Sequence, residues 1–295
     1  MRKAVVDRPA SVRAKLLTYS KQHRLAFDLI LTRYALERLL DRLSRSRHVD
    51  RFALKGAMLL TTWIDDPMRG TRDLDLLGFG DPDLDGLRAA IAEIMAIEAD
   101  DGLVFDHAAL QAQPIREDNA YGGVRLRTTA SLGSARIPIV VDVAFGDSIE
   151  PGLDVIDYPV LLDLPRPKVK AYAPETVIAE KFQAMVALGR ANSRMKDFYD
   201  VWSLTRFYAL DPDRTARAVA ATFFRRGTAL PDTLPDALTA AFAADPSKQR
   251  QWKAFTTDLA VSQMSLAQIV DDLASSLMPT VERARSIEQT TKEIE

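Results

Sequence analysis

The segment Arg69-Gly70-Thr71-Arg72-Asp73-Leu74-Asp75-Leu76 decides how this sequence of 295 residues is interpreted. Its polar and apolar residues alternate, which predicts a short strand over residues 69–77. Residues two apart on a strand share a face, so one face is expected to carry Arg69, Thr71, Asp73 and Asp75. Two neighbouring carboxylates repel each other unless a cation lies between them. The pattern therefore predicts a metal site, with a pair of surface aspartates as the alternative.

A third carboxylate interrupts an apolar stretch further along the chain. Asp142 lies in the run Ile139-Val140-Val141-Asp142-Val143-Ala144-Phe145, which is typical of a buried strand. An ionised carboxylate in such a strand is costly unless something compensates it. A metal ion shared with Asp73 and Asp75 provides that compensation, and an arginine such as Arg125 or Arg127 is the alternative.

The composition limits the kinds of site that the chain is able to build. There is no cysteine and there are three separated histidines, which excludes thiolate chemistry and argues against a His-rich metal site. Any metal is therefore expected to bind oxygen ligands, which favours Mg²⁺ or Mn²⁺. We find neither a bilayer-length apolar run nor a leader segment, so the protein is expected to be compact, cytoplasmic and not bound to a membrane.

The order of the sequence patterns predicts an α+β fold in three regions. We expect an N-terminal helical region over residues 1–51, a small α/β core with a mixed sheet over residues 52–165, and a C-terminal helical bundle over residues 166–295. The proline-rich connector Asp163-Leu164-Pro165-Arg166-Pro167 marks the second boundary, because it continues neither a helix nor a central strand. The expected architecture is bilobed.

Several elements are predicted within these regions. They are two helices between residues 11 and 47, a helix over 84–99, a hairpin of strands 124–129 and 136–145, helices beginning at Pro174 and near Lys196, and a fraying tail from Val281.

The segment Lys55-Gly56-Ala57 precedes a predicted helix. A glycine at such a turn allows backbone N–H groups to approach a phosphate at the start of a helix. One glycine is a weak signal, and its position upstream of Asp73 gives it weight.

Charged residues also occupy apolar faces of the C-terminal helices. Lys181 falls within the arc formed by Val177, Ala184 and Leu188. It either reaches a phosphate or extends its ammonium group to solvent. In the next helix Asp197 lies on the apolar arc and Asp200 to one side, so Lys181 and Asp197 are expected to form a polar pair, with a role for Asp197 as the helix N-cap as the alternative.

The charge is unevenly distributed along the chain. Residues 1–55 hold about 14 basic and about 5 acidic residues, whereas residues 73–121 are strongly acidic. The basic N-terminal helices are expected to attract an RNA backbone, with ordinary solvated helix faces as the alternative.

Together these motifs resemble those of a known family. In chain order they are Leu54-Lys55-Gly56-Ala57-Met58-Leu59-Leu60, Arg69-x-Thr71-x-Asp73-x-Asp75, Val141-Asp142-Val143, Pro174-Glu175-x5-Lys181 and Arg194-x-Lys196-Asp197-x-x-Asp200. The set resembles the AbiEii/AbiGii toxin family of the DNA polymerase β-like nucleotidyltransferase superfamily, which includes the MenT toxins. The resemblance covers the chain from its N-terminal helices to about residue 210.

The resemblance implies that the protein is a toxin of a toxin–antitoxin or phage-defence system. Such a toxin is expected to transfer NMP from an NTP to an acceptor, for which the 3′ end of tRNA is the first expectation. It implies a cognate antitoxin that often carries a winged-helix domain. Asp73, Asp75 and Asp142 are the expected metal ligands and, with Lys181 and Asp197, the catalytic residues. The expected nucleotide-binding residues are Lys55, Gly56, Ala57, Arg69, Thr71, Lys181 and Asp200. Ala57 departs from the family, which usually has a second glycine or a serine there.

The expected mechanism follows from this assignment. Asp73 and Asp75 hold two Mg²⁺ ions, Asp142 helps to deprotonate an acceptor hydroxyl, and Lys181 steadies the triphosphate. Two alternatives remain open. In the first, the acceptor is the hydroxyl of a protein or a small molecule instead of tRNA. In the second, the chain is catalytically silent and binds a nucleotide or its antitoxin.

Overall fold

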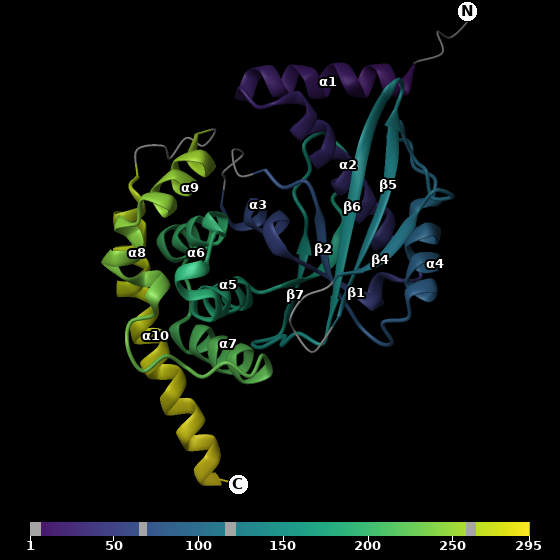
Figure 1. Cartoon of the computed structure of the whole chain (residues 1–295). Helices are drawn as coiled ribbons and strands as arrows, with labels where there is room; N and C mark the ends of the chain where they lie inside the picture. Colours follow the sequence, from purple (N-terminus) through teal and green to yellow (C-terminus); the bar gives the residue numbers. More distant parts are fainter. Residues whose placement is uncertain (1–6, 65–69, 116–121, 258–263, 295) are drawn as a thin grey trace, which may run out of the picture. The chain divides into compact units, whose positions relative to one another are not determined.

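The computed structural model describes residues 7–64, 70–115, 122–257 and 264–294 (Figure 1). The chain divides into two compact units. The first unit takes its described residues from Met1–Thr62, Gly70–Gly146 and Asp154–Ala171, and the second from Trp63–Arg69, Asp147–Leu153 and Tyr172–Glu295. The division into regions at residues 51 and 165 stays a prediction.

An eight-stranded mixed sheet forms the centre of the first unit. Its strands are β1 (Phe52–Lys55), β2 (Leu74–Gly78), β3 (Leu103–Phe105), β4 (Gln111–Ile115), β5 (Gly123–Leu132), β6 (Ala135–Phe145), β7 (Leu153–Asp157) and β8 (Lys168–Tyr172). The strand order is β3-β5-β6-β2-β1-β8-β7, with β4 also paired to β5. Strand β2 runs antiparallel to β1 and parallel to β6, so the sheet is mixed, as predicted.

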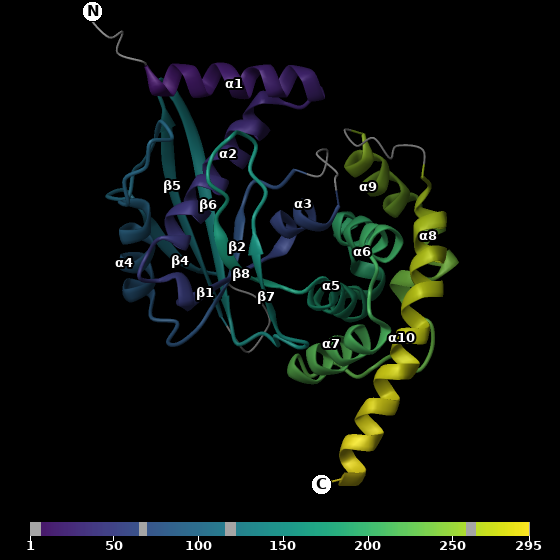
Figure 2. The ribbon, with the colours of Figure 1, turned by 180° about the vertical axis from the view of Figure 1, so that it is seen from behind.

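Helices cover one face of this sheet. They include α1 (Arg8–His23), α2 (Phe27–Ser44) and α4 (Leu84–Met95). Helix α2 packs against β6 and α4 against β4, and the two helices touch each other, so they lie on the same face (Figure 2). The predicted helices within residues 11–47 and 84–99 are thus present with shifted ends.

Alternation along β6 decides which face carries the polar residues. Val141 and Val143 are fully buried, whereas Asp142 between them is only half-buried. Because successive strand residues point to opposite faces, Asp142 lies on the face opposite α2. The apolar run is therefore buried on one face more than on the other, rather than equally on both.

The second unit is helical. Its helices are α5 (Pro174–Leu188), α6 (Met195–Phe207), α7 (Pro212–Arg225), α8 (Ala240–Ala244), α9 (Pro246–Thr256) and α10 (Leu266–Ile294). Helix α5 packs on α6 and α7, and α10 packs on α6, α7 and α8. The short helix α3 (Leu60–Trp63) and the 3₁₀ turns Val49–Arg51, Gly56–Leu59, Gly189–Ala191 and Asp236–Leu238 complete the described helical structure.

Two sequence expectations differ from the structure. Strand β2 begins at Leu74 rather than at residue 69, so Thr71 and Asp73 precede the strand. The tail is not frayed from Val281, because α10 continues to Ile294 and buries Val281 and Ala284. The predicted hairpin is confirmed as β5 and β6, and α5 begins at Pro174 as expected. Within the described part of the chain, no helix combines the length and the apolarity needed to cross a bilayer.

Candidate metal and nucleotide site

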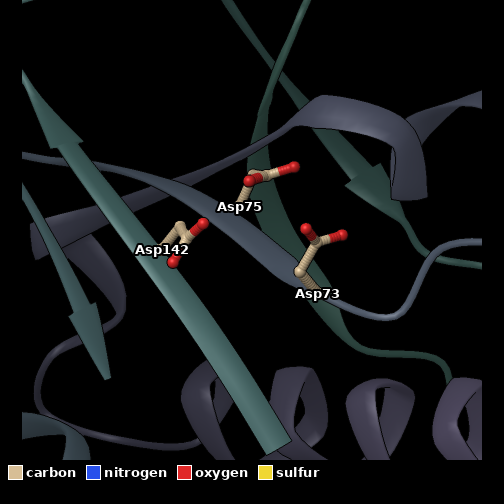
Figure 3. A group of neighbouring side chains, drawn as sticks. All are labelled: Asp73, Asp75 and Asp142. Carbon is tan, nitrogen blue, oxygen red and sulfur yellow. The ribbon is translucent and has the colours of Figure 1, made fainter. Parts of the chain in front are cut away.

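Three carboxylates meet on the face of the sheet opposite α2. One oxygen from each of Asp73, Asp75 and Asp142 lies within 4.8 Å of the others, and all three residues are half-buried. Figure 3 shows the three side chains converging from β2, the segment before it, and β6. The first prediction from the sequence, that these residues gather at one place, agrees with this geometry.

Strand register places the polar residues in a row. Asp75 pairs with Lys55 across β1 and with Asp142 across β6, and Asp142 pairs with Arg125 across β5. Paired residues on neighbouring strands share a face and are about 5 Å apart. A row of charged residues therefore runs across four strands in the order Lys55, Asp75, Asp142, Arg125, with the two acids in the middle and a base at each end.

Gly56 adjoins this row at the end of β1. Its φ is +73°, and a Cβ atom at this position would lie 2.0 Å from the Oδ2 atom of Asp75. A side chain is thus excluded both by backbone conformation and by space. Ala57 follows within the 3₁₀ turn Gly56–Leu59 and is half-buried. The backbone of this turn and the carboxylate of Asp75 therefore approach each other closely.

Asp73 is oriented from its own segment. The hydroxyl of Thr71 donates a hydrogen bond to Oδ1 of Asp73. Thr71 therefore supports Asp73 as a hydrogen-bond donor, although neither residue lies on the strand. Arg72 pairs with Asp28 at 2.8 Å, on an exposed part of the surface. Arg69 lies outside the described residues, so the prediction that it binds nucleotide stays a prediction.

Arg125 forms a bidentate ion pair with Asp142. Its Nε atom lies 2.7 Å from Oδ1 and its Nη2 atom 2.5 Å from Oδ2. The hydrogen bond with Asp142 raises the pKa of Arg125, and the charges of Asp142, Asp73 and Asp75 contribute. The arginine alternative for compensating Asp142 is thus present, and Arg125 provides it. Arg127 is exposed and pairs in register with Val140.

The ligand set suits a small divalent cation. All three groups are carboxylates, which are the ligands that Mg²⁺ and Mn²⁺ prefer. Opposite ligands of one Mg²⁺ are about 4.2 Å apart, so small side-chain rotations bring oxygens within 4.8 Å into range. The acidic cluster is consistent with the metal site of a nucleotidyltransferase.

The second unit holds a separate buried charge cluster. The Nζ atom of Lys181 lies 2.6 Å from Oδ1 of Asp197 and 3.0 Å from Oδ2 of Asp200. Arg194 adds an ion pair of 2.6 Å to Asp197. Both aspartates are fully buried, and Lys181 is 11% exposed. Sequence reasoning placed Asp200 to one side, but both acids in fact contact the lysine.

This cluster fixes the protonation of Lys181. Burial alone lowers the pKa of a lysine, but the charges of Asp200 and Asp197 outweigh burial and raise the pKa of Lys181. The ammonium group therefore stays charged at neutral pH. The pair that the sequence predicted is present as part of a four-residue cluster.

Comparison with known proteins adds a family. The sequence model of the family described as "Nucleotidyl transferase AbiEii toxin, Type IV TA system" matches residues 38–284. No curated protein matches the chain.

Two solved structures from Helicobacter pylori are similar. A candidate nucleotidyltransferase is 14% identical, with a TM-score of 0.51 over 87% of this chain and 96% of that chain. JHP933 is 14% identical, with a TM-score of 0.48 over 90% of this chain and 97% of that chain. At such identity the first of these supports the fold alone.

Proposed function

Because the chain belongs to the AbiEii family of nucleotidyl transferase toxins from type IV toxin–antitoxin systems, we propose that it transfers NMP from an NTP to the 3′ end of tRNA. The observation that carries this proposal is the convergence of Asp73, Asp75 and Asp142 beside the Gly56 turn. An oxygen-only ligand set next to a close backbone turn suits a metal-bound triphosphate.

The proposed metal ligands are Asp73, Asp75 and Asp142. Bound Mg²⁺ or Mn²⁺ supplies electrostatic stabilisation of the triphosphate and lowers the pKa of an acceptor hydroxyl. Gly56 allows the backbone of the 3₁₀ turn to approach Asp75 closely, so we propose that N–H groups of this turn bind the triphosphate beside the metal ligands, with Lys55 next to Asp75 in register.

The proposed reaction is an in-line displacement. The acceptor oxygen forms a bond to the α-phosphorus, the bond from the α-phosphorus to the bridging oxygen breaks, and pyrophosphate leaves. The hydroxyl proton passes to Asp142. Each carboxylate oxygen keeps a second lone pair while Arg125 is bound, so Asp142 retains the capacity to accept it.

We also propose functional roles for Lys181 and Asp197. The resemblance implies that both are essential, and the proposed role of Lys181 is to contribute a permanent positive charge to nucleotide binding, with Asp197 and Asp200 orienting it. The buried ion pairs hold the ammonium group from two sides within the second unit.

The surface of α1 supports an RNA acceptor. Four exposed basic residues lie on or directly after this helix, namely Arg13, Lys15, Lys21 and Arg24. By contrast, basic residues of α2 are used internally: Arg42 is buried against Asp101 at 2.6 Å, and Arg33 pairs with Glu37 at 2.9 Å. We therefore propose that α1, rather than α2, attracts the RNA backbone. The affinity of the protein for RNA should then fall steeply as the salt concentration rises.

The family implies an antitoxin partner. We propose that this partner is a winged-helix protein and that the pair acts in phage defence.

One observation favours a catalytically silent, nucleotide-binding or antitoxin-binding alternative. Arg125 compensates Asp142 within the protein, so the charge of Asp142 alone does not require a metal. The convergence of Asp73 and Asp75 on the same point still favours the transferase.

The deciding experiment incubates the purified protein with Mg²⁺, total tRNA and each labelled NTP in turn, beside an Asp73→Asn control. Label on tRNA with the unmutated protein alone establishes the transferase and names the nucleotide. Label on a polypeptide moves the acceptor to protein. Absence of label with all four NTPs supports the silent alternative.

A further inference from the structure

Arg125 forms hydrogen bonds to the carboxylate of Asp142, which is one of the three proposed metal ligands. Its guanidinium contacts both oxygens of Asp142, at 2.7 Å and 2.5 Å. This planar, two-point contact is the strongest form of charge-assisted hydrogen bonding between side chains. A metal ion that binds Asp142 has to share these oxygens with the guanidinium or displace it.

The position of Arg125 also exposes it to the whole acidic cluster. It stands at the β5 end of the row, directly opposite Asp142, and the charges of Asp73 and Asp75 act on it as well. The positive charge of the guanidinium neutralises part of the negative potential that would otherwise attract a divalent cation. Its side chain is 35% exposed while that of Asp142 is 15% exposed, so Arg125 has room to rotate toward solvent.

We propose that Arg125 is a positioning residue that competes with the metal ion for Asp142 and thereby weakens divalent-cation binding at the three-carboxylate site. This inference rests on the proposed metal-dependent function. A site of this kind binds its ion more weakly than three carboxylates alone would. Metal binding is then expected to depend more strongly on the additional oxygen ligands that a triphosphate brings.

The test is a Mn²⁺ titration of the full chain without nucleotide, followed by calorimetry or by the EPR signal of unbound Mn²⁺. Arg125→Gln should bind Mn²⁺ about tenfold more tightly than the unmutated protein, the effect expected from losing one charge-assisted two-point contact. Arg125→Lys keeps the charge but loses the planar fork, so its affinity should lie between the two.

Arg127→Gln is the matched control. Arg127 lies two residues further along β5 on the same face as Arg125, and in the described structure it does not contact Asp142. Its substitution by glutamine removes the same charge as Arg125→Gln does. The Mn²⁺ affinity of this variant should stay within about twofold of the unmutated value, because solvent and salt screen an exposed charge that does not contact the carboxylates. Asp73→Asn assigns the binding to this site, since it should abolish the signal.

The outcomes separate this inference from the proposed function. Equal affinities for Arg125→Gln and Arg127→Gln, with binding that Asp73→Asn removes, would overturn the role of Arg125 and leave the metal site intact. No Mn²⁺ binding by any variant would overturn the metal site and this inference together. Should Arg125→Gln fail to fold in a thermal-unfolding measurement, an affinity of Arg125→Lys equal to that of the unmutated protein would still overturn the proposal.

Discussion

Gly56 and Asp75 lie so close that the glycine has no substitute. Replacing Gly56 by alanine introduces a methyl group 2.0 Å from a carboxylate oxygen and forces an L-residue to a φ of +73°. The conformation alone costs about 1–2 kcal/mol of unfolding free energy, and the clash must also move Asp75. We expect Gly56→Ala to lose Mn²⁺ binding and at least tenfold in nucleotide transfer.

Gly80→Ala is the control for this prediction. Gly80 also has a positive φ, +98°, but a Cβ atom there meets nothing within 4 Å. Its substitution should cost about 1 kcal/mol in chemical denaturation and leave Mn²⁺ binding unchanged. Equal metal affinity in both variants would contradict the proposed closeness of the turn to the ligand set.

Lys181 is predicted to stabilise the second unit as well as to serve the reaction. Lys181→Met removes a buried ion-pair partner from both Asp197 and Asp200, so we expect a loss of about 3–5 kcal/mol in unfolding free energy. Adding Asp200→Asn to this variant should recover part of that loss. Denaturant titrations measure both values, and a Lys181→Met protein of unchanged stability would show that the lysine has no structural role.

Single residues show where sequence reasoning succeeds. The sequence predicted that Asp73, Asp75 and Asp142 gather because charge within or beside apolar strands is costly and therefore informative. The structure brings the three together, although Asp73 precedes β2. Arg125 was only one of two possible partners for Asp142, since register between β5 and β6 decides which arginine lies opposite. The contact of Asp200 with Lys181 depends on how α5 packs against α6, which no single-helix pattern reveals.

Among the elements, those with strong periodicity were predicted best. The β5–β6 hairpin and the start of α5 at Pro174 follow from alternation and from a proline suited to the first turn of a helix. The start of β2 was misplaced because Thr71 and Asp73 mimic strand alternation while bonding to each other. The polar composition of the last part of α10 predicts a frayed end, because it gives no sign that Val281 and Ala284 are buried.

Helix α2 is tied to the segment before β8 by a buried carboxylate. Glu37 accepts hydrogen bonds from Arg33 at 2.9 Å and from the N–H of Leu161 at 3.0 Å. Burial outweighs these contacts and raises the pKa of Glu37 above its ordinary value. Stability linked to this group is therefore fully present below the unfolded pKa of about 4.5 and is lost as pH rises through the raised folded pKa.

Glu37→Gln removes this titration. The difference in unfolding free energy, variant minus unmutated protein, should therefore become more positive as pH rises from about 4 toward neutrality. Urea titrations at several pH values measure it. A difference that stays constant with pH would contradict a raised pKa for Glu37.

For the chain as a whole, a divalent ion is expected to act as a folding ligand. An ion that binds the native state at tenfold its Kd adds about 1.4 kcal/mol to the unfolding free energy. Mn²⁺ should therefore raise the midpoint of thermal unfolding in a concentration-dependent way, and Asp73→Asn should cancel the effect. An equal increase in the Asp73→Asn protein would place the responsible ion elsewhere.

The crowding of three carboxylates within 4.8 Å also has a consequence for how this toxin is handled in the laboratory. Without a cation their mutual repulsion is expected to oppose folding, so under the proposed function a neutral residue at position 73 should relieve the repulsion and also remove activity. Cultures forced to overproduce the toxin would then accumulate variants that are both harmless and more robust. A clone that suddenly yields abundant, heat-resistant protein is one to resequence before it is assayed.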